Sequence, residues 1–265
     1  MNRPLPLALC VFDTTKQHFG RKDIYRHAIS DLAAKIPLEC FKTRLVHIKA
    51  SSNDEVQLAE QEAFYRSLGF EVLVTPGDWR HHDENGGNSH QRGYSADLIK
   101  VYGHPSVLAC DYVWHFESDW KVDTKGEQLI DRLSEGLAQL ASNPRLVGIR
   151  FPRFLNEVDR LNNLMRKHGL NVRTERRGSF IYHNDNLSLN PGLFRSYGMF
   201  LATRLMKQNP ALQEHVEHAF THALSWMADG DLPWAIYDPA RVSVLHIGTK
   251  VGEEDVTPPV ETITP

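Results

Sequence analysis

Short apolar runs alternate with helical patterns through the first 150 residues, and this alternation limits the possible folds more than any other feature. Strands are expected at 5–12, 44–49, 70–74, 112–117 and 145–151. Helices are expected between them, at 23–35, 52–69, 89–102 and 126–140. The pattern predicts an α/β, Rossmann-like domain with a mostly parallel central sheet flanked by helices.

The second half is less regular. Residues 156–186 are polar and charged, and 186–196 are expected to form a loop around Pro191-Gly192. Asn209 as a cap and Pro210 at the first helical position begin a helix that is expected to reach residue 228. A last short strand is expected at 242–248.

Composition excludes several functional classes. The net charge of -3 gives no overall electrostatic case for binding nucleic acid or membranes. The apolar runs are far shorter than the roughly 20 residues of a membrane span, and the first run is expected to be a strand rather than a signal peptide. Three isolated cysteines form neither a disulfide framework nor a zinc motif, which favours a reducing, cytoplasmic setting.

One stretch, DYVWHFESDWKVD from Asp111 to Asp123, begins as a buried strand and ends with paired acids. Glu117 and Asp119 stand at the carboxyl end of this strand, where open α/β sheets bind ligands. Residues two apart on an extended chain point the same way, so these carboxylates are expected to share a cation. Oxygen ligands suit Mg²⁺ or Mn²⁺. The alternative is a solvated strand end with a chance acidic pair.

The segment YVWHFESDW resembles the metal-binding strand of GT-A-fold glycosyltransferases, where an Asp-x-Asp or a variant closes the strand. Glu117-Ser118-Asp119 departs from that pattern at its first acid. Three further segments resemble this family in the expected order, and the resemblance covers about 5–250; the segments are Asn85–Leu98, Asn186–Ser196 and Val244–Lys250.

The resemblance implies a transferase that moves a sugar from a nucleotide-diphosphate sugar, expected to be UDP-linked, to an acceptor hydroxyl with Mn²⁺ or Mg²⁺. It implies that Asp119 binds the ion directly and that Glu117 binds it through water or holds the donor ribose. It also implies His246 as a ligand from the other end of the chain, and Lys250 is placed to contact the diphosphate. Without the resemblance, a structural histidine and a surface lysine are the simpler interpretations.

Donor recognition is expected at the ends of the first strands. Phe12, Asp13 and Thr14 follow the first strand and are candidates to line the nucleoside. Asn88 and Arg92 stand at the start of the helix expected beneath the donor, where free N–H groups attract anions and an arginine adds a fork for phosphate. The alternative for Arg92 is a solvated helix face.

An inverting reaction needs a carboxylate to take the proton from the acceptor hydroxyl. Glu217 lies beside the apolar stripe of the helix expected from 210, in a segment that resembles the family's base position. Glu214 and Asp231 are alternatives, and ordinary surface acids are the simpler interpretation of all three.

The acceptor is the least constrained part. The basic segment Arg160–Arg177 suggests an anionic glycan, a small molecule or a hydroxylated base in DNA, although a solvated basic face explains it as well. The histidine-rich loop around His81 lacks the spacing of a zinc site.

The domain plan is one catalytic domain over 1–250, with a donor half at about 1–122 and an acceptor half at 123–250, followed by a mobile tail at 251–265. Two other functions stay open. A sugar nucleotidylyltransferase would need a glycine-rich phosphate loop after the first strand, where only Gly20 occurs. A non-catalytic nucleotide-sugar-binding module is the other.

Overall fold

The structure is a computed structural model. It describes residues 4–15, 23–50, 55–76, 89–124, 126, 128–153, 173–184, 191–214, 216–217, 220–221 and 232–247. The predicted tail 251–265 lies outside the described residues.

A nine-stranded sheet runs through the molecule in the order β3-β2-β1-β4-β9-β6-β10-β8-β7, and a separate two-stranded sheet pairs β11 with β5. The strands are β1 (Leu5–Thr14), β2 (Phe41–Ala50), β3 (Glu71–Pro76), β4 (Tyr112–Glu117), β5 (Trp120–Asp123), β6 (Gly148–Arg150), β7 (Thr174–Arg177), β8 (Phe180–His183), β9 (Gly192–Arg195), β10 (Trp234–Tyr237) and β11 (Ser243–His246).

Most strands of the large sheet point the same way. β3, β2, β1 and β4 are parallel neighbours. β9 runs against both β4 and β6, β10 is parallel to β6, and β8 runs against β10 and β7. Only β9 and β8 therefore oppose the others among the described strands, and the predicted mostly parallel α/β fold is confirmed.

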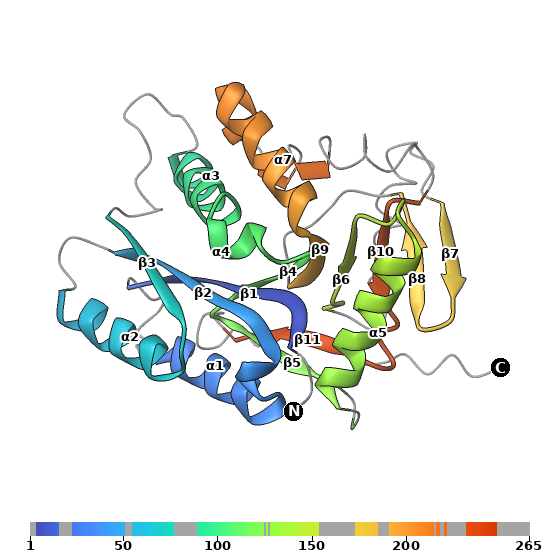
Figure 1. Ribbon diagram of the computed structural model, residues 1–265, viewed down its shortest axis with the longest axis horizontal. Helices are drawn as coiled ribbons and strands as arrows, with labels where there is room; N and C mark the ends of the chain where they lie inside the picture. Colours follow the sequence, from blue (N-terminus) through green and yellow to red (C-terminus); the bar gives the residue numbers. More distant parts are fainter. Residues whose placement is uncertain are drawn as a thin grey trace, which may run out of the picture.

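Helices cover both faces of this sheet (Figure 1). One core holds the apolar sides of α1, α2 and α5, and the other holds those of α3, α4 and α7. The helices and short 3-10 turns are α1 (Ile24–Lys35), α2 (Glu55–Ser67), α3 (Ser89–Tyr102), α4 (Pro105–Leu108), α5 (Leu129–Ser142), α7 (Ser196–Gln208), η2 (Leu38–Cys40) and η3 (Pro210–Glu214). The predicted stripe of α5 is confirmed, because Leu133, Leu137 and Leu140 are buried.

The prediction of a loop at 186–196 is wrong for the second half of that segment. Gly192–Arg195 is β9, which lies in the middle of the large sheet between β4 and β6. Phe194 packs where Gly148 has no side chain, since a Cβ there would lie 2.4 Å from the Phe194 ring. The strand starts directly after Pro191, so the turn-forming residues of the sequence obscured a short strand buried on both faces.

The region after β9 also differs from the prediction. Helix α7 begins at Ser196, where no helix was predicted, and the four-residue strands β7, β8 and β10 were not predicted either. Asn209 does act as a cap, accepting a hydrogen bond from the backbone N–H of Ala211 at 3.2 Å. The segment it starts is first the 3-10 turn η3, and residues 216–217 and 220–221 are helical.

Candidate metal and donor site

The chain turns sharply at the end of β4, and this turn brings a distant strand to the acids. The backbone N–H of Ser118 donates to the carbonyl of Phe12 at 3.0 Å, and the chain then reverses into β5. β11 pairs with β5 and places His246 opposite Trp120. The N–H of Ile247 donates to the carbonyl of Asp119 at 2.7 Å, which ties the last described residue to the turn.

Asp119 and His246 meet directly. Nε2 of His246 lies 2.9 Å from Oδ2 of Asp119, and their side chains are 25% and 31% exposed, so solvent or a ligand can reach both. Adjacent ligands of an octahedral Mg²⁺ ion, each at about 2.1 Å, stand about 3.0 Å apart. The separation of these two atoms therefore matches that of two neighbouring ligands of one ion. The hydrogen bond to Asp119 raises the pKa of His246, while burial and the charge of Arg153 act in the opposite direction.

Glu117 faces another direction. Its Oε2 accepts from the indole N–H of Trp120 at 2.9 Å, and its Oε1 accepts from the hydroxyl of Tyr94 at 3.2 Å. Burial, and then the charge of Asp119, raise the pKa of Glu117 to about 7. Because Asp119 already lies in the turn, the two acids do not continue one extended strand. Among the described residues, no three His, Cys, Asp or Glu side chains gather into a metal cluster.

Asp13 supports this turn from the side of α2. It is 2% exposed, and the Ser118 hydroxyl donates to its Oδ1 at 2.6 Å. The Tyr65 hydroxyl donates to Oδ2 at 2.9 Å. Burial raises the pKa of Asp13 to about 6, and the hydrogen bond from Ser118 partly offsets this. The contacts of Asp13 are therefore those of a residue that holds the turn between Glu117 and Asp119.

A chain of buried hydrogen bonds reaches Glu117 from the core beneath α3. The Tyr102 hydroxyl lies 2.5 Å from Nδ1 of His115, and Nε2 of His115 lies 3.2 Å from the Tyr94 hydroxyl. Since Tyr94 uses its one proton toward Glu117, it accepts from Nε2–H of His115, and Tyr102 donates to Nδ1. The ring of Phe12 is 2% exposed and packs 4.8 Å from the His115 ring, so it is a core side chain.

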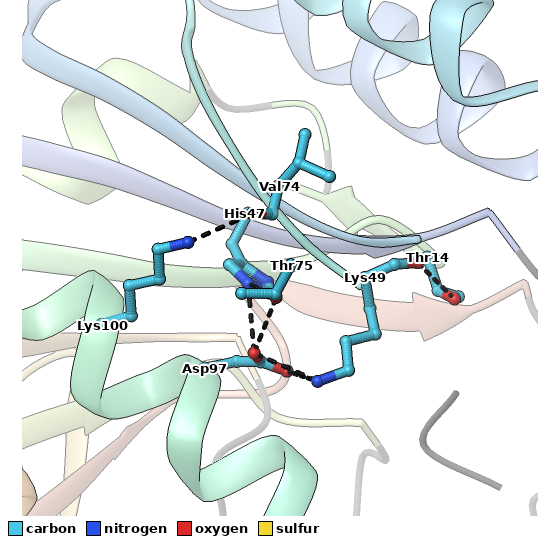
Figure 2. Close-up of polar contacts among 7 residues, drawn as sticks. All are labelled: Thr14, His47, Lys49, Val74, Thr75, Asp97 and Lys100. Atoms are coloured by element: carbon cyan, nitrogen blue, oxygen red, sulfur yellow. Dashed lines mark hydrogen bonds and ion pairs between the residues drawn. The ribbon is translucent and has the colours of Figure 1, made fainter. Parts of the chain in front are cut away.

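A second buried polar cluster fastens α3 to the carboxyl ends of β2 and β3 (Figure 2). Asp97, 1% exposed, lies 3.2 Å from Nζ of Lys49 and 3.2 Å from Nε2 of His47. The Thr75 hydroxyl donates to the same carboxylate at 2.9 Å. At the neighbouring end of β1, the hydroxyl of Thr14 donates to the carbonyl of Lys49 at 3.2 Å. The predicted donor residue Thr14 thus lies where β1 and β2 end together.

Arg153 completes the surroundings of the turn, and sequence reasoning missed it. Its guanidinium lies over the Trp120 ring, 5.0 Å from the centroid, and the ring of His246 also lies 4.8 Å from that of Trp120. The main chain beside it is anchored, because Val244 N–H donates to the Pro152 carbonyl at 2.8 Å. No local sequence motif identifies Arg153, because it reaches Trp120 only through the pairing of β5 with β11, which are far apart in sequence.

The remaining predicted site residues are only partly described. Asn88 and Lys250 lie outside the described residues, and the backbone of Arg92 belongs to α3 while its side chain is not described. Glu217 is exposed. Burial, with smaller contributions from charges that include Glu117 and Glu217, raises the pKa of Tyr94 well above its usual value, so Glu217 lies within electrostatic reach of Tyr94.

The basic segment Arg160–Arg177 is described only from residue 173. Arg176 forms an ion pair with Asp238, and Arg177 pairs with Glu175 at 2.6 Å. Arg177 also lies over the Tyr182 ring, 4.7 Å from its centroid. These contacts partly neutralise the described end of the segment.

Comparison with solved structures identifies proteins that share this fold. A putative glucose-1-phosphate thymidylyltransferase from Bacillus anthracis matches with a TM-score of 0.50 and 9% identity, over 92% of this chain and 90% of that one. GalNAc-T7 with UDP, GalNAc and Mn²⁺ matches with a TM-score of 0.52 and 9% identity, over 98% of this chain and 46% of that one. The architecture is that of GT-A-type glycosyltransferases, in agreement with the sequence resemblance.

Other comparisons add little to that assignment. No protein-family model and no curated protein matches the chain. Within the part of the chain that the structure describes, none of the helices has the length and apolar character needed to cross a bilayer.

Proposed function

We propose that this protein is a metal-dependent glycosyltransferase that moves a sugar from a nucleotide-diphosphate sugar to an acceptor hydroxyl. The observation that carries the proposal is the 2.9 Å contact between Asp119 and His246, two residues from distant parts of the chain. They meet at the carboxyl end of β4, next to β1, which is where open α/β sheets bind ligands. The sequence resemblance and the GT-A architecture support the same reaction.

In this proposal, Asp119 and His246 hold one Mn²⁺ or Mg²⁺ ion. Such an ion, when bound, stabilises the negative charge that builds up on the departing diphosphate. Glu117, held by Tyr94 and Trp120, orients the donor or binds the ion through water. Thr14 lies at the end of β1 where the nucleoside is proposed to bind, and Asn88, Arg92 and Lys250 are proposed to contact the donor.

Glu217 is proposed as the general base, which makes the reaction inverting. Its exposure and its electrostatic effect on Tyr94 support a place near the donor site. A base must reach the acceptor hydroxyl while that hydroxyl attacks, so an exposed carboxylate beside the donor has the required chemistry. In the same proposal, residues up to about 122 form the donor half, and residues 123–250 form the acceptor half.

A sugar nucleotidylyltransferase is the second candidate, because the thymidylyltransferase shares the architecture to a similar degree. The products separate the two. Purified protein would be incubated with Mn²⁺, a panel of nucleotide sugars and acceptors that include oligosaccharides, peptides and hydroxymethylated DNA. Release of a nucleoside diphosphate with a glycosylated acceptor supports the transferase. Turnover that needs pyrophosphate supports the nucleotidylyltransferase, and binding without turnover supports a non-catalytic module.

A further inference from the structure

Arg153 lies near the candidate metal pair, since its positive charge opposes the rise in the pKa of His246. Its guanidinium lies on the face of Trp120, and the ring of Trp120 lies against His246, which contacts Asp119. Trp120 is itself fixed, because it is 4% exposed and its N–H donates to Glu117. The ring of Trp120 therefore fixes the position of Arg153 relative to Glu117 and His246.

The backbone holds Arg153 in the same place. Pro152 accepts a hydrogen bond from Val244 of β11, two residues before His246. β11 in turn pairs with β5 along its length, so the end of β6, β11 and β5 form one connected unit. The side chain of Arg153 is half-buried, which limits the rotamer entropy lost when it binds a ligand.

Charge indicates what such a residue would bind. Asp119 offsets one of the two positive charges of a divalent ion, while Glu117 is turned toward Tyr94 and Trp120. A nucleoside diphosphate, with roughly three negative charges, would then need a further cation. A guanidinium that stacks on an aromatic ring keeps its N–H groups in one plane, and a fork of two N–H groups matches the oxygens of phosphate.

We infer that Arg153 binds the diphosphate of the donor, beside the ion held by Asp119 and His246. This inference rests on the proposed function. In this inference, the negative charge of the departing diphosphate is stabilised by a residue that follows β6, in the proposed acceptor half. Arg153 is thus expected to link donor binding to the packing of β5 against β11.

Binding of nucleoside diphosphates by calorimetry tests this assignment without any turnover. UDP, GDP and uridine would each be titrated with Mn²⁺ into the wild-type protein, Arg153→Ala, Arg153→Lys and Arg145→Ala. Arg145 is exposed near the start of β6, so Arg145→Ala controls for the loss of one positive charge. Thermal unfolding of each variant shows whether it is folded.

Arg153→Ala is expected to weaken the binding of UDP or GDP about 10- to 100-fold, which is the effect of losing a charge-assisted contact. Arg153→Lys should fall between this variant and the wild type because it keeps the charge but not the fork. Uridine binding and the Arg145→Ala protein should be unchanged. Unchanged diphosphate affinity in folded Arg153→Ala overturns this inference alone, whereas a wild-type protein that binds neither diphosphate overturns the proposed function as well.

Discussion

At the scale of single residues, the site depends on which polar atoms lie next to one another. Asp13 is an example, because its nearest side-chain partners are Ser118 and Tyr65 and it is almost completely buried. Asp13, which stays a predicted donor residue, also holds the turn that carries Asp119. Residue type alone does not distinguish these two roles, since both use a carboxylate at a strand end.

Replacing Asp119 with alanine is expected to abolish Mn²⁺-dependent donor binding. The variant removes one of the two side chains proposed to hold a single ion, and because the Asp119 side chain is partly exposed the fold should stay intact. Calorimetry with Mn²⁺ and UDP measures the loss. Asp111→Ala removes an exposed acid just before the start of β4 and should behave as the wild type. Wild-type donor binding by Asp119→Ala would mean that the turn is structural.

Because His183 is buried, the protein is expected to lose stability in acid. Burial, and then the charge of Arg150, lower the pKa of His183 to about 3, whereas a histidine in the unfolded chain has a pKa near 6.5. As the pH falls below 6.5, the unfolded chain takes up the proton first, so stability is lost down to about pH 3. Between pH 7 and pH 5 the wild type should lose about 2 kcal/mol more unfolding free energy than His183→Gln.

Urea denaturation at several pH values measures this difference. His27→Gln, which changes an exposed residue of α1, controls for the loss of one histidine. Curves of unfolding free energy against pH that run parallel for wild type and His183→Gln would contradict the assignment.

At the scale of elements, α3 and the strands it covers are joined by charge as well as by apolar packing. The Lys49–Asp97 pair lies between β2 and α3, and the two side chains are 10% and 1% exposed. Breaking such a pair leaves a buried charge without its partner, while removing both charges avoids that cost. The cluster therefore fixes how α3 sits over the carboxyl ends of β2 and β3.

Asp97→Asn should lower the unfolding free energy by about 3 kcal/mol or more, because it leaves the Lys49 ammonium without its carboxylate. Combining it with Lys49→Met should recover part of that loss. The matched control is Glu62→Gln, which breaks the pair between Arg66 and Glu62 on the surface of α2 and should cost less than about 1 kcal/mol. Urea denaturation of the single and double variants measures the coupling. Strictly additive losses would show that the two charges do not stabilise each other.

At the scale of the whole molecule, the site is made by residues far apart in sequence. Asp119 is near the middle of the chain and His246 near its end, and the pairing of β5 with β11 unites them. Arg153 reaches the same place from the segment that follows β6. Glu217, the proposed base, comes from a fourth segment. A variant of Glu217 therefore tests whether the proposed acceptor half lies against the donor half.

Glu217→Gln is expected to lower the rate of sugar transfer at least about 100-fold with little change in donor affinity, because a general base acts only in the transition state. Rates of transfer and UDP affinity are measured on the same preparation, and NMR of the product should show inversion at the anomeric carbon. Glu214→Gln, about one turn earlier in the chain, is the matched control. Retention of configuration, or a normal rate in Glu217→Gln, would assign Glu217 another task.

The first half of the fold could be predicted from sequence because its strands and helices are long and strongly periodic. β1, β2, α1 and α5 lie where apolar periodicity placed them. The short strands β9 and β10 were missed, since nearly all of their residues are buried and no alternation of apolar and polar side chains marks them. Likewise, the sequence predicted Asp119 and His246 as partners only through a family resemblance.

What the sequence alone determined was the α/β layering and the acids at the end of β4, because both follow from local pattern. The tertiary structure decided which side chain each acid faces. Glu117 turns to Tyr94 and Trp120, and Asp119 turns to His246. The reason is physical: the turn at residues 118–119 breaks the alternation of an extended strand, and the partners come from α3, β5 and β11, whose positions depend on long-range pairing.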